Sequence, residues 1–163
     1  GELSAGKAGA HKPKEAKLQD DYFDEGGSTS LYQMIQSMTV GDKIKLALTG
    51  NKEARGTLLK QSNKVVSRSV VRNPRITEDE VVKITQTRSV ADEILREIAR
   101  NDEWLKSYPI KRGLAFNPKT PVQISLRLLA KLNVKDLATL STSKGVPNVV
   151  AAAARKIVDR KKN

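Results

Sequence analysis

The chain of 163 residues contains no cysteine, one histidine and few aromatic residues: one tryptophan, three tyrosines and two phenylalanines. Without cysteine there can be no disulfide, no thiolate nucleophile and no thiolate zinc site, and the absence fits a reducing compartment. The single histidine, His11, lies in a polar N-terminal segment, and no glycine-rich phosphate loop is present. We therefore expect no enzyme activity, no catalytic residue, no metal and no cofactor.

Long hydrophobic runs are also missing. No stretch approaches the roughly 20 apolar residues that a membrane-spanning helix needs, and the opening segment lacks the apolar core of a signal peptide. These observations predict a cytoplasmic protein without a membrane span.

Positive charge is abundant and unevenly distributed. The net charge is +12, but residues 1–28 hold four lysines against six acidic residues, so that the rest of the chain is the basic part. Such an imbalance attracts polyanions. Expected partners are nucleic acid or an acidic protein surface.

Residues 1–30 have few large apolar side chains and many charges, a composition that predicts a disordered tail. Within it, Asp20–Glu25 is an acidic cluster that encloses Tyr22 and Phe23. The cluster could dock on a partner through these two aromatic residues, fold back on the basic body as an autoinhibitor, or be a solvated linker. Residues 31–163 are expected to form one helical-repeat domain.

Apolar residues recur at helical spacing from Leu31 onwards, and no segment carries a competing strand pattern. We interpret Ser62 as an N-cap, Thr77–Glu80 as a capping box, and Thr120 as an N-cap followed by Pro121 at the first helical position. Asn101–Tyr108, with the only tryptophan, is expected to be a connector. Expected helices begin near Leu31, Thr39, Lys52, Ser62, Thr77, Ser89, Pro109, Thr120, Asn133 and Asn148.

One sequence motif occurs three times: a basic residue, an apolar stretch, and Asn five positions after the basic residue. It spans Arg68–Asn73, Arg96–Asn101 and Arg112–Asn117, and proline follows the first and third Asn. Because Pro ends a helix at the residue before it, the motif indicates repeated helix ends and stacked helical hairpins.

Asn73-Pro74 and Asn117-Pro118-Lys119-Thr120-Pro121, with the Arg-led helices before them, resemble bacterial leucine-rich-variant repeats and, more loosely, HEAT-like repeats. The resemblance covers about residues 62–133. It implies an all-α fold, an irregular right-handed α-solenoid used as a binding scaffold, without implying a particular ligand.

Basic residues follow one another at helical spacing in several places. On a helix, Lys64, Arg68 and Arg72 fall within an arc of about 80°, with Val66 and Val70 on the far side. A polyanion could bind such ridges, although solvated helix faces and helix C-termini also favour basic residues. The candidate polyanion-binding residues are Lys60, Lys64, Arg68, Arg72, Arg75, Arg96, Arg100, Arg112, Arg127 and Lys131.

The first functional hypothesis is a non-enzymatic module that binds nucleic acid electrostatically. A protein-interaction scaffold is the alternative from another class. A HEAT-like DNA glycosylase is a third, and it would depend on Arg100, Asp102 and Trp104.

Overall fold

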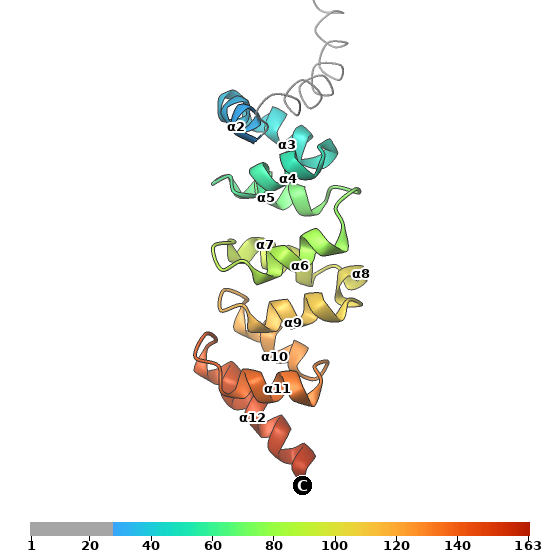
Figure 1. Cartoon of the computed structure of the whole chain (residues 1–163), viewed down its shortest axis with the longest axis vertical. Helices are drawn as coiled ribbons and strands as arrows, with labels where there is room; N and C mark the ends of the chain where they lie inside the picture. The colour runs from blue at the N-terminus through green and yellow to red at the C-terminus, as the bar shows by residue number, and fades with distance from the viewer. Residues whose placement is uncertain (1–27) are drawn as a thin grey trace, which may run out of the picture. The chain divides into compact units, whose positions relative to one another are not determined.

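The computed structural model describes residues 28–163, which form eleven helices and no β-strand (Figure 1). For this part of the chain, the prediction of an all-α protein is confirmed. The cluster with Tyr22 and Phe23, and nearly all of the predicted tail, lie outside the described residues. The chain divides into two compact units, unit 1 ending at Ile76 and unit 2 beginning at Thr77.

Unit 1 contains α2 (Ser28–Ser37), α3 (Val40–Thr49), α4 (Lys52–Leu59) and α5 (Lys64–Val71). Helix α3 packs against α4 and α5, α4 also packs against α5, and α2 packs against α4. Most apolar positions that recur at helical spacing in the sequence form the core of this unit, whereas Val40 and Val65 are exposed. Its almost fully buried side chains are Leu31, Ile35, Leu46, Ala47, Ala54, Leu58, Val66 and Val70.

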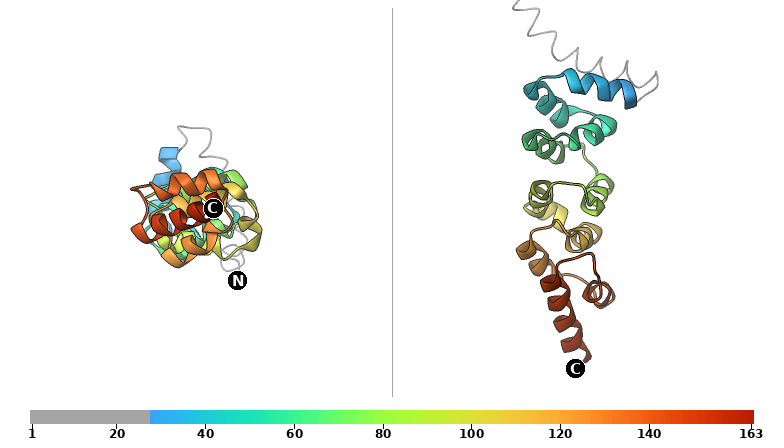
Figure 2. Two further views of the ribbon diagram at one scale, coloured as in Figure 1. Left: turned by 90° about the horizontal axis from the view of Figure 1, so that it is seen from below. Right: turned by 90° about the vertical axis from the view of Figure 1, so that its left-hand side faces the viewer.

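Unit 2 is built around α9, which packs against α6 on one side and α10 on the other (Figure 1). Helix α12 packs against α10 and α11, and Figure 2 shows it continuing past α11 to the C-terminus. The helices of this unit are α6 (Glu78–Gln86), α7 (Asp92–Ala99), α8 (Asp102–Leu105), α9 (Tyr108–Phe116), α10 (Val122–Leu129), α11 (Val134–Ser141) and α12 (Asn148–Lys162).

Helices α3 to α12 fall into three consecutive groups with one packing pattern. In each group the first helix packs against the last: α3 against α5, α6 against α9, and α10 against α12. This pattern is compatible with a helical repeat fold. The second group differs in the connection between its second and last helices. That connection covers residues 100–107 and contains α8, whereas residues 60–63 suffice between α4 and α5.

The repeated Asn-Pro pairs have a tertiary role as well as ending helices. In unit 1, the Asn73 side-chain nitrogen donates to the carbonyls of Ala47 and Gly50, at 2.9 and 3.0 Å, at the end of α3. Its side-chain oxygen accepts from the Arg75 amide at 2.9 Å. One buried side chain therefore closes its own turn and satisfies carbonyls that the end of α3 leaves without intrahelical partners.

Asn117 repeats this arrangement in unit 2. Its nitrogen donates to the carbonyls of Thr85 and Thr87, at 2.8 and 3.1 Å, and its oxygen accepts from the Lys119 amide at 2.9 Å. Asn101 differs: it is exposed and accepts from the Glu103 amide as the N-cap of α8. Two of the three copies of the sequence motif are therefore structurally equivalent.

Three local expectations are corrected by the structure. The N-cap of α5 is Asn63 rather than Ser62, because the Asn63 side chain accepts from the first-turn amides of α5. The N-cap of α10 is Pro121, and Thr120 is instead buried. The expected connector at Asn101–Tyr108 contains helix α8, which Asn101 and the acidic residues of its first turn stabilise.

Candidate anion-binding site

The basic residues predicted in unit 1 lie at the ends and on the outer side of its helices. Lys64 and Arg72 are exposed, but Arg68 between them is only partly exposed, and its Nε is buried without a hydrogen-bond partner among the described residues. Arg75 donates from Nη2 to the Thr49 carbonyl at 3.0 Å and so helps to cap α3. Lys60 is the exposed C-cap of α4. Among the basic residues predicted in unit 1, at least Arg75 thus has a structural role.

Two of the basic residues predicted in unit 2 have acidic neighbours on their own helix. Arg96 Nε lies 3.5 Å from Asp92, with both side chains about half exposed, and Arg100 Nη1 lies 3.9 Å from Glu97. The exposed Arg96–Asp92 pair contributes little to stability, whereas the Glu97 side chain beside Arg100 is mostly buried. Both pairs reduce the local positive charge that a polyanion would meet.

Arg112 has a more specific environment. Its Nε donates to Asp136 Oδ1 at 3.1 Å, and its guanidinium lies over the Phe116 ring, 4.5 Å from the centroid. Together with Arg88 it also lines a small cavity of about 120 Å³. Arg112 is therefore first a packing residue between α9 and α11.

Arg127 and Lys131, by contrast, line a larger pocket of about 440 Å³ in unit 2. Two basic residues that we did not predict, Lys106 and Lys111, line the same pocket, and Asp102 is the one carboxylate among its lining residues. Four positive charges therefore face one negative charge. Its remaining lining residues are apolar: Ala99, Leu105, Ile124 and Leu128.

Most of these cations are available to a ligand. Among residues 28–163, no acidic side chain forms an ion pair with Lys111, Arg127 or Lys131. Lys106 lies 3.0 Å from Glu103, but that pair is exposed on both sides. The pocket is thus an amphipathic site. We call its four apolar lining residues the apolar wall, and its four basic residues, which come from three separate segments, the cationic rim.

Helix α8 builds one wall of the pocket. The pocket residues Asp102 and Leu105 lie on α8, and Lys106 is its C-cap. This helix is the additional element in the second group of helices. Insertions in repeat proteins commonly gather on one face, which is often the binding face.

The basic rim has a local explanation too. Arg127 lies in the last turn of α10 and Lys131 follows its end, where positive charge interacts favourably with the helix dipole. That explanation does not extend to Lys111, which lies in the middle of α9. Lys106 and Lys111 were missed because we searched for basic residues at four-residue spacing. Their position on either side of Ser107, the N-cap of α9, was the available signal.

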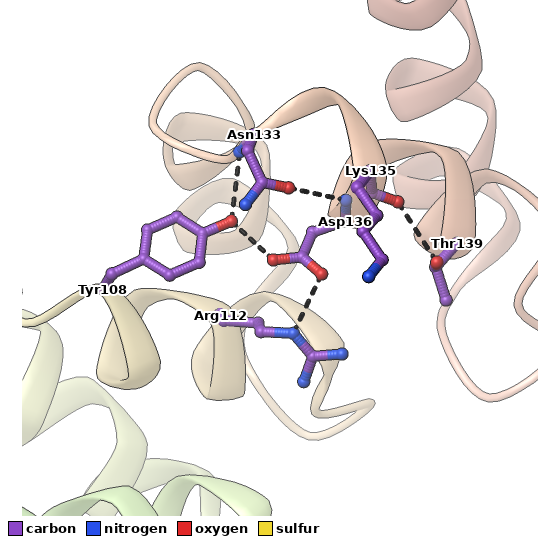
Figure 3. A network of polar contacts seen from close by, with 6 residues as sticks. All are labelled: Tyr108, Arg112, Asn133, Lys135, Asp136 and Thr139. Carbon is purple, nitrogen blue, oxygen red and sulfur yellow. Dashed lines mark hydrogen bonds and ion pairs between the residues drawn. The ribbon is translucent and has the colours of Figure 1, made fainter.

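A polar network in unit 2 fixes α9 to the start of α11 (Figure 3). The Tyr108 hydroxyl donates to Asp136 Oδ2 and accepts from the Asn133 amide at 3.0 Å, while Arg112 donates to the other oxygen of Asp136. Asn133 in turn accepts from the Asp136 amide at 2.8 Å. The network holds α9, which carries Lys111, in a defined position.

The network shifts two pKa values in opposite directions. Burial by itself raises the pKa of Asp136, but the hydrogen bonds from Tyr108 and Arg112 outweigh it, so that the pKa lies below its ordinary value. Burial, followed by the hydrogen bond to Asp136, raises the pKa of Tyr108. At neutral pH the network therefore contains a carboxylate and a neutral phenol.

Features of other functional classes were also sought in residues 28–163. No three acidic or histidine side chains gather there as metal ligands, and none of the helices has the length and apolar character to cross a bilayer. Of the residues that a glycosylase would use, Asp102 lines the pocket, and Arg100 is paired with Glu97. Trp104 is partly exposed on α8.

Fold and site together define a basic all-α protein with an amphipathic, cation-rimmed pocket beside an added helix. No protein-family model, curated protein or solved structure matches the chain.

Proposed function

We propose that the protein binds nucleic acid, with the pocket of unit 2 as the main contact site. The observation that carries this proposal is the gathering of Lys106, Lys111, Arg127 and Lys131 around one pocket that contains a single carboxylate. Like charges brought together in this way repel one another, and a ligand with several negative charges relieves the repulsion. Phosphate groups of a nucleic acid supply such charges at regular intervals.

The remaining predicted basic residues are proposed to contribute at longer range. Lys60, Lys64 and Arg72 are exposed, and Arg96 and Arg100 are partly screened by their acidic neighbours. Contacts of this kind position a nucleic acid without reading its sequence. Arg112 is not included among the main contacts because Asp136 occupies its Nε.

We also propose that the three groups of helices are repeats of the HEAT-like or leucine-rich-variant kind, stacked as an irregular right-handed α-solenoid. The recurring packing of the first and last helix in each group supports this proposal. The matching hydrogen bonds of Asn73 and Asn117 support it as well.

The test is a mobility-shift titration of the full chain with mixed-sequence DNA and RNA at low and moderate salt. We expect binding that weakens steeply with salt and that the variant K111Q/R127Q/K131Q weakens by about tenfold or more. The matched control is K144Q/K156Q/R160Q, which removes the same number and types of charge from exposed or partly exposed positions elsewhere in unit 2.

Equal loss in both variants would mean that only net charge matters, and the assignment of the pocket would be wrong. No shift at micromolar protein would remove nucleic acid as the partner. The protein-interaction scaffold would then be the better hypothesis.

A further inference from the structure

The pocket of unit 2 is larger and more apolar than a phosphate-binding site requires. Its volume of about 440 Å³ falls within the size range of small-molecule pockets. Phosphate groups would contact only its cationic rim. The partly exposed Ala99, Leu105 and Ile124 would remain in contact with water, whereas Leu128 is buried.

A ligand that covers both parts must combine an apolar body with negative charges on either side of it. A nucleotide within a strand has this chemistry, because its planar base is flanked by two phosphates. Arg127 lies in the last turn of α10 and Lys131 follows the end of this helix, whereas Lys106 and Lys111 come from other segments. The four cations therefore reach one pocket from three separate segments, so that they can contact more than one phosphate of a strand.

We propose, in an inference that rests on the proposed function, that the pocket binds one unstacked nucleotide of a single-stranded nucleic acid. The base lies on the wall formed by Leu105, Ile124 and Leu128, and Lys106, Lys111, Arg127 and Lys131 hold the flanking phosphates. The guanidinium of Arg127 can also stack on a base, which an ammonium group cannot do. A base in a duplex is paired and stacked, so a duplex reaches only the rim.

This inference predicts a preference for single strands. An unstacked base that leaves water for an apolar wall gains a hydrophobic contact that a paired and stacked base of a duplex does not make. We therefore expect the full chain to bind a single strand about tenfold more tightly than a duplex of the same sequence. The pocket residues include no aromatic ring, so the preference among the four bases should be weak.

Fluorescence anisotropy with the full chain tests the inference with three labelled probes: a mixed-sequence single strand, its duplex, and an abasic strand of equal length. The abasic strand keeps the phosphates and lacks the bases, so it should bind about tenfold more weakly than the normal strand. This comparison uses the unmodified protein and does not depend on whether a variant folds.

A substitution in the apolar wall gives an independent test. Leu105→Ser should remove most of the preference for the single strand and leave duplex affinity nearly unchanged. Leu59→Ser is the control, because Leu59 is also partly buried but lies in unit 1, on α4. The Leu59→Ser variant should keep the preference for the single strand over the duplex.

The outcomes separate this inference from the proposed function. Equal affinity for all three probes, with K111Q/R127Q/K131Q still weakening them, would overturn the inference and leave nucleic-acid binding intact. No binding to any probe would overturn both. Tighter binding of a synthetic peptide with the sequence of residues 18–27, which is acidic and aromatic, would also overturn the inference in favour of an acidic peptide ligand.

Discussion

Single buried side chains carry much of the tertiary specificity of this protein. Asn73 and Asn117 each satisfy two carbonyls at the end of another helix, and Asp136 receives hydrogen bonds from Tyr108 and Arg112. Buried polar groups that lose their partner cost more than the bond itself contributes, because the remaining group stays desolvated. The residues concerned should therefore be sensitive even to small changes.

Asn117→Ala removes both donors to the carbonyls of Thr85 and Thr87. We expect it to lower the free energy of unfolding by about 1–3 kcal/mol. Asn101→Ala removes only the exposed N-cap of α8 and should cost about 1 kcal/mol or less. Urea unfolding followed by circular dichroism measures both, and equal costs would contradict the distinction between the two Asn residues.

The Asp136 network predicts a pH dependence. Because the pKa of Asp136 is lowered in the folded protein, its contribution to stability is present above the ordinary Asp pKa of about 3.9 and is lost as the pH falls through the folded-state pKa. Asp136→Asn should therefore flatten the acid side of the stability profile. Asp159→Asn, at an exposed position, is the control. Urea unfolding at a series of pH values provides the readout, and parallel profiles for wild type and D136N would count against the network.

The contribution of Tyr108 to stability should depend on pH in the opposite direction. Its pKa is raised in the folded protein, so its contribution is present below the ordinary Tyr pKa of about 10 and is lost as the pH rises through the folded-state pKa. Tyr108→Phe should cost about 1 kcal/mol at neutral pH. In alkaline solution wild type and Y108F should converge, and spectrophotometric titration of the tyrosines gives the matching observation. A constant difference between the two proteins up to high pH would contradict this account.

At the scale of whole elements, the contact between α6 and α9 is set by a glycine. A Cβ added at Gly113 would overlap Thr85 Oγ1 and lie 2.8 Å from Thr85 Cβ. The two helices can therefore approach this closely only because residue 113 has no side chain. The same close contact keeps Asn117 within reach of the last carbonyls of α6.

Gly113→Ala should consequently destabilise the protein, by about 1–3 kcal/mol, because either α9 or Thr85 must move. Gly56→Ala makes the identical change inside α4, where nothing lies within 4 Å of the added Cβ. That variant should gain up to about 1 kcal/mol from helix propensity. Thermal unfolding of the two variants compares them directly, and stabilisation by G113A would show that the contact is not tight.

At the scale of the whole molecule, the excess of positive charge is general but the pocket is local. Net charge determines whether a polyanion approaches, and its long-range attraction falls as salt rises. The four cations around the pocket lie within unit 2. General attraction and a local site can therefore be distinguished by measuring which backbone amides a bound nucleic acid protects from hydrogen exchange.

Hydrogen exchange followed by mass spectrometry addresses this question. With saturating single strand, we expect slower exchange of amides in α8 and α10, with little change in α3 and α4. Helix α5 carries Lys64 and Arg72 and serves as the internal comparison. Protection confined to α5 would move the main contact to the basic residues of unit 1.

The sequence by itself determined the helices and most of their ends. Apolar spacing, the Thr77–Glu80 capping box and the Asn-Pro stops act within a few residues, so they can be read before any packing is known. Two errors were local, because the side chains of Asn63 and Asn101 cap the helices that follow them, whereas a third occurred where burial overrode a local preference. Thr120 is a good N-cap by type, yet it is buried.

Only the tertiary structure decided which distant residues meet. The bond from Asn117 to Thr85 spans 32 residues and the Arg112–Asp136 contact spans 24, and no local pattern specifies such pairs. The pocket likewise depends on α8, which we expected to be an irregular connector, and on Lys106 and Lys111 meeting Arg127 and Lys131. Helix formation is local, whereas the position of a charge on a folded surface depends on how every intervening helix packs.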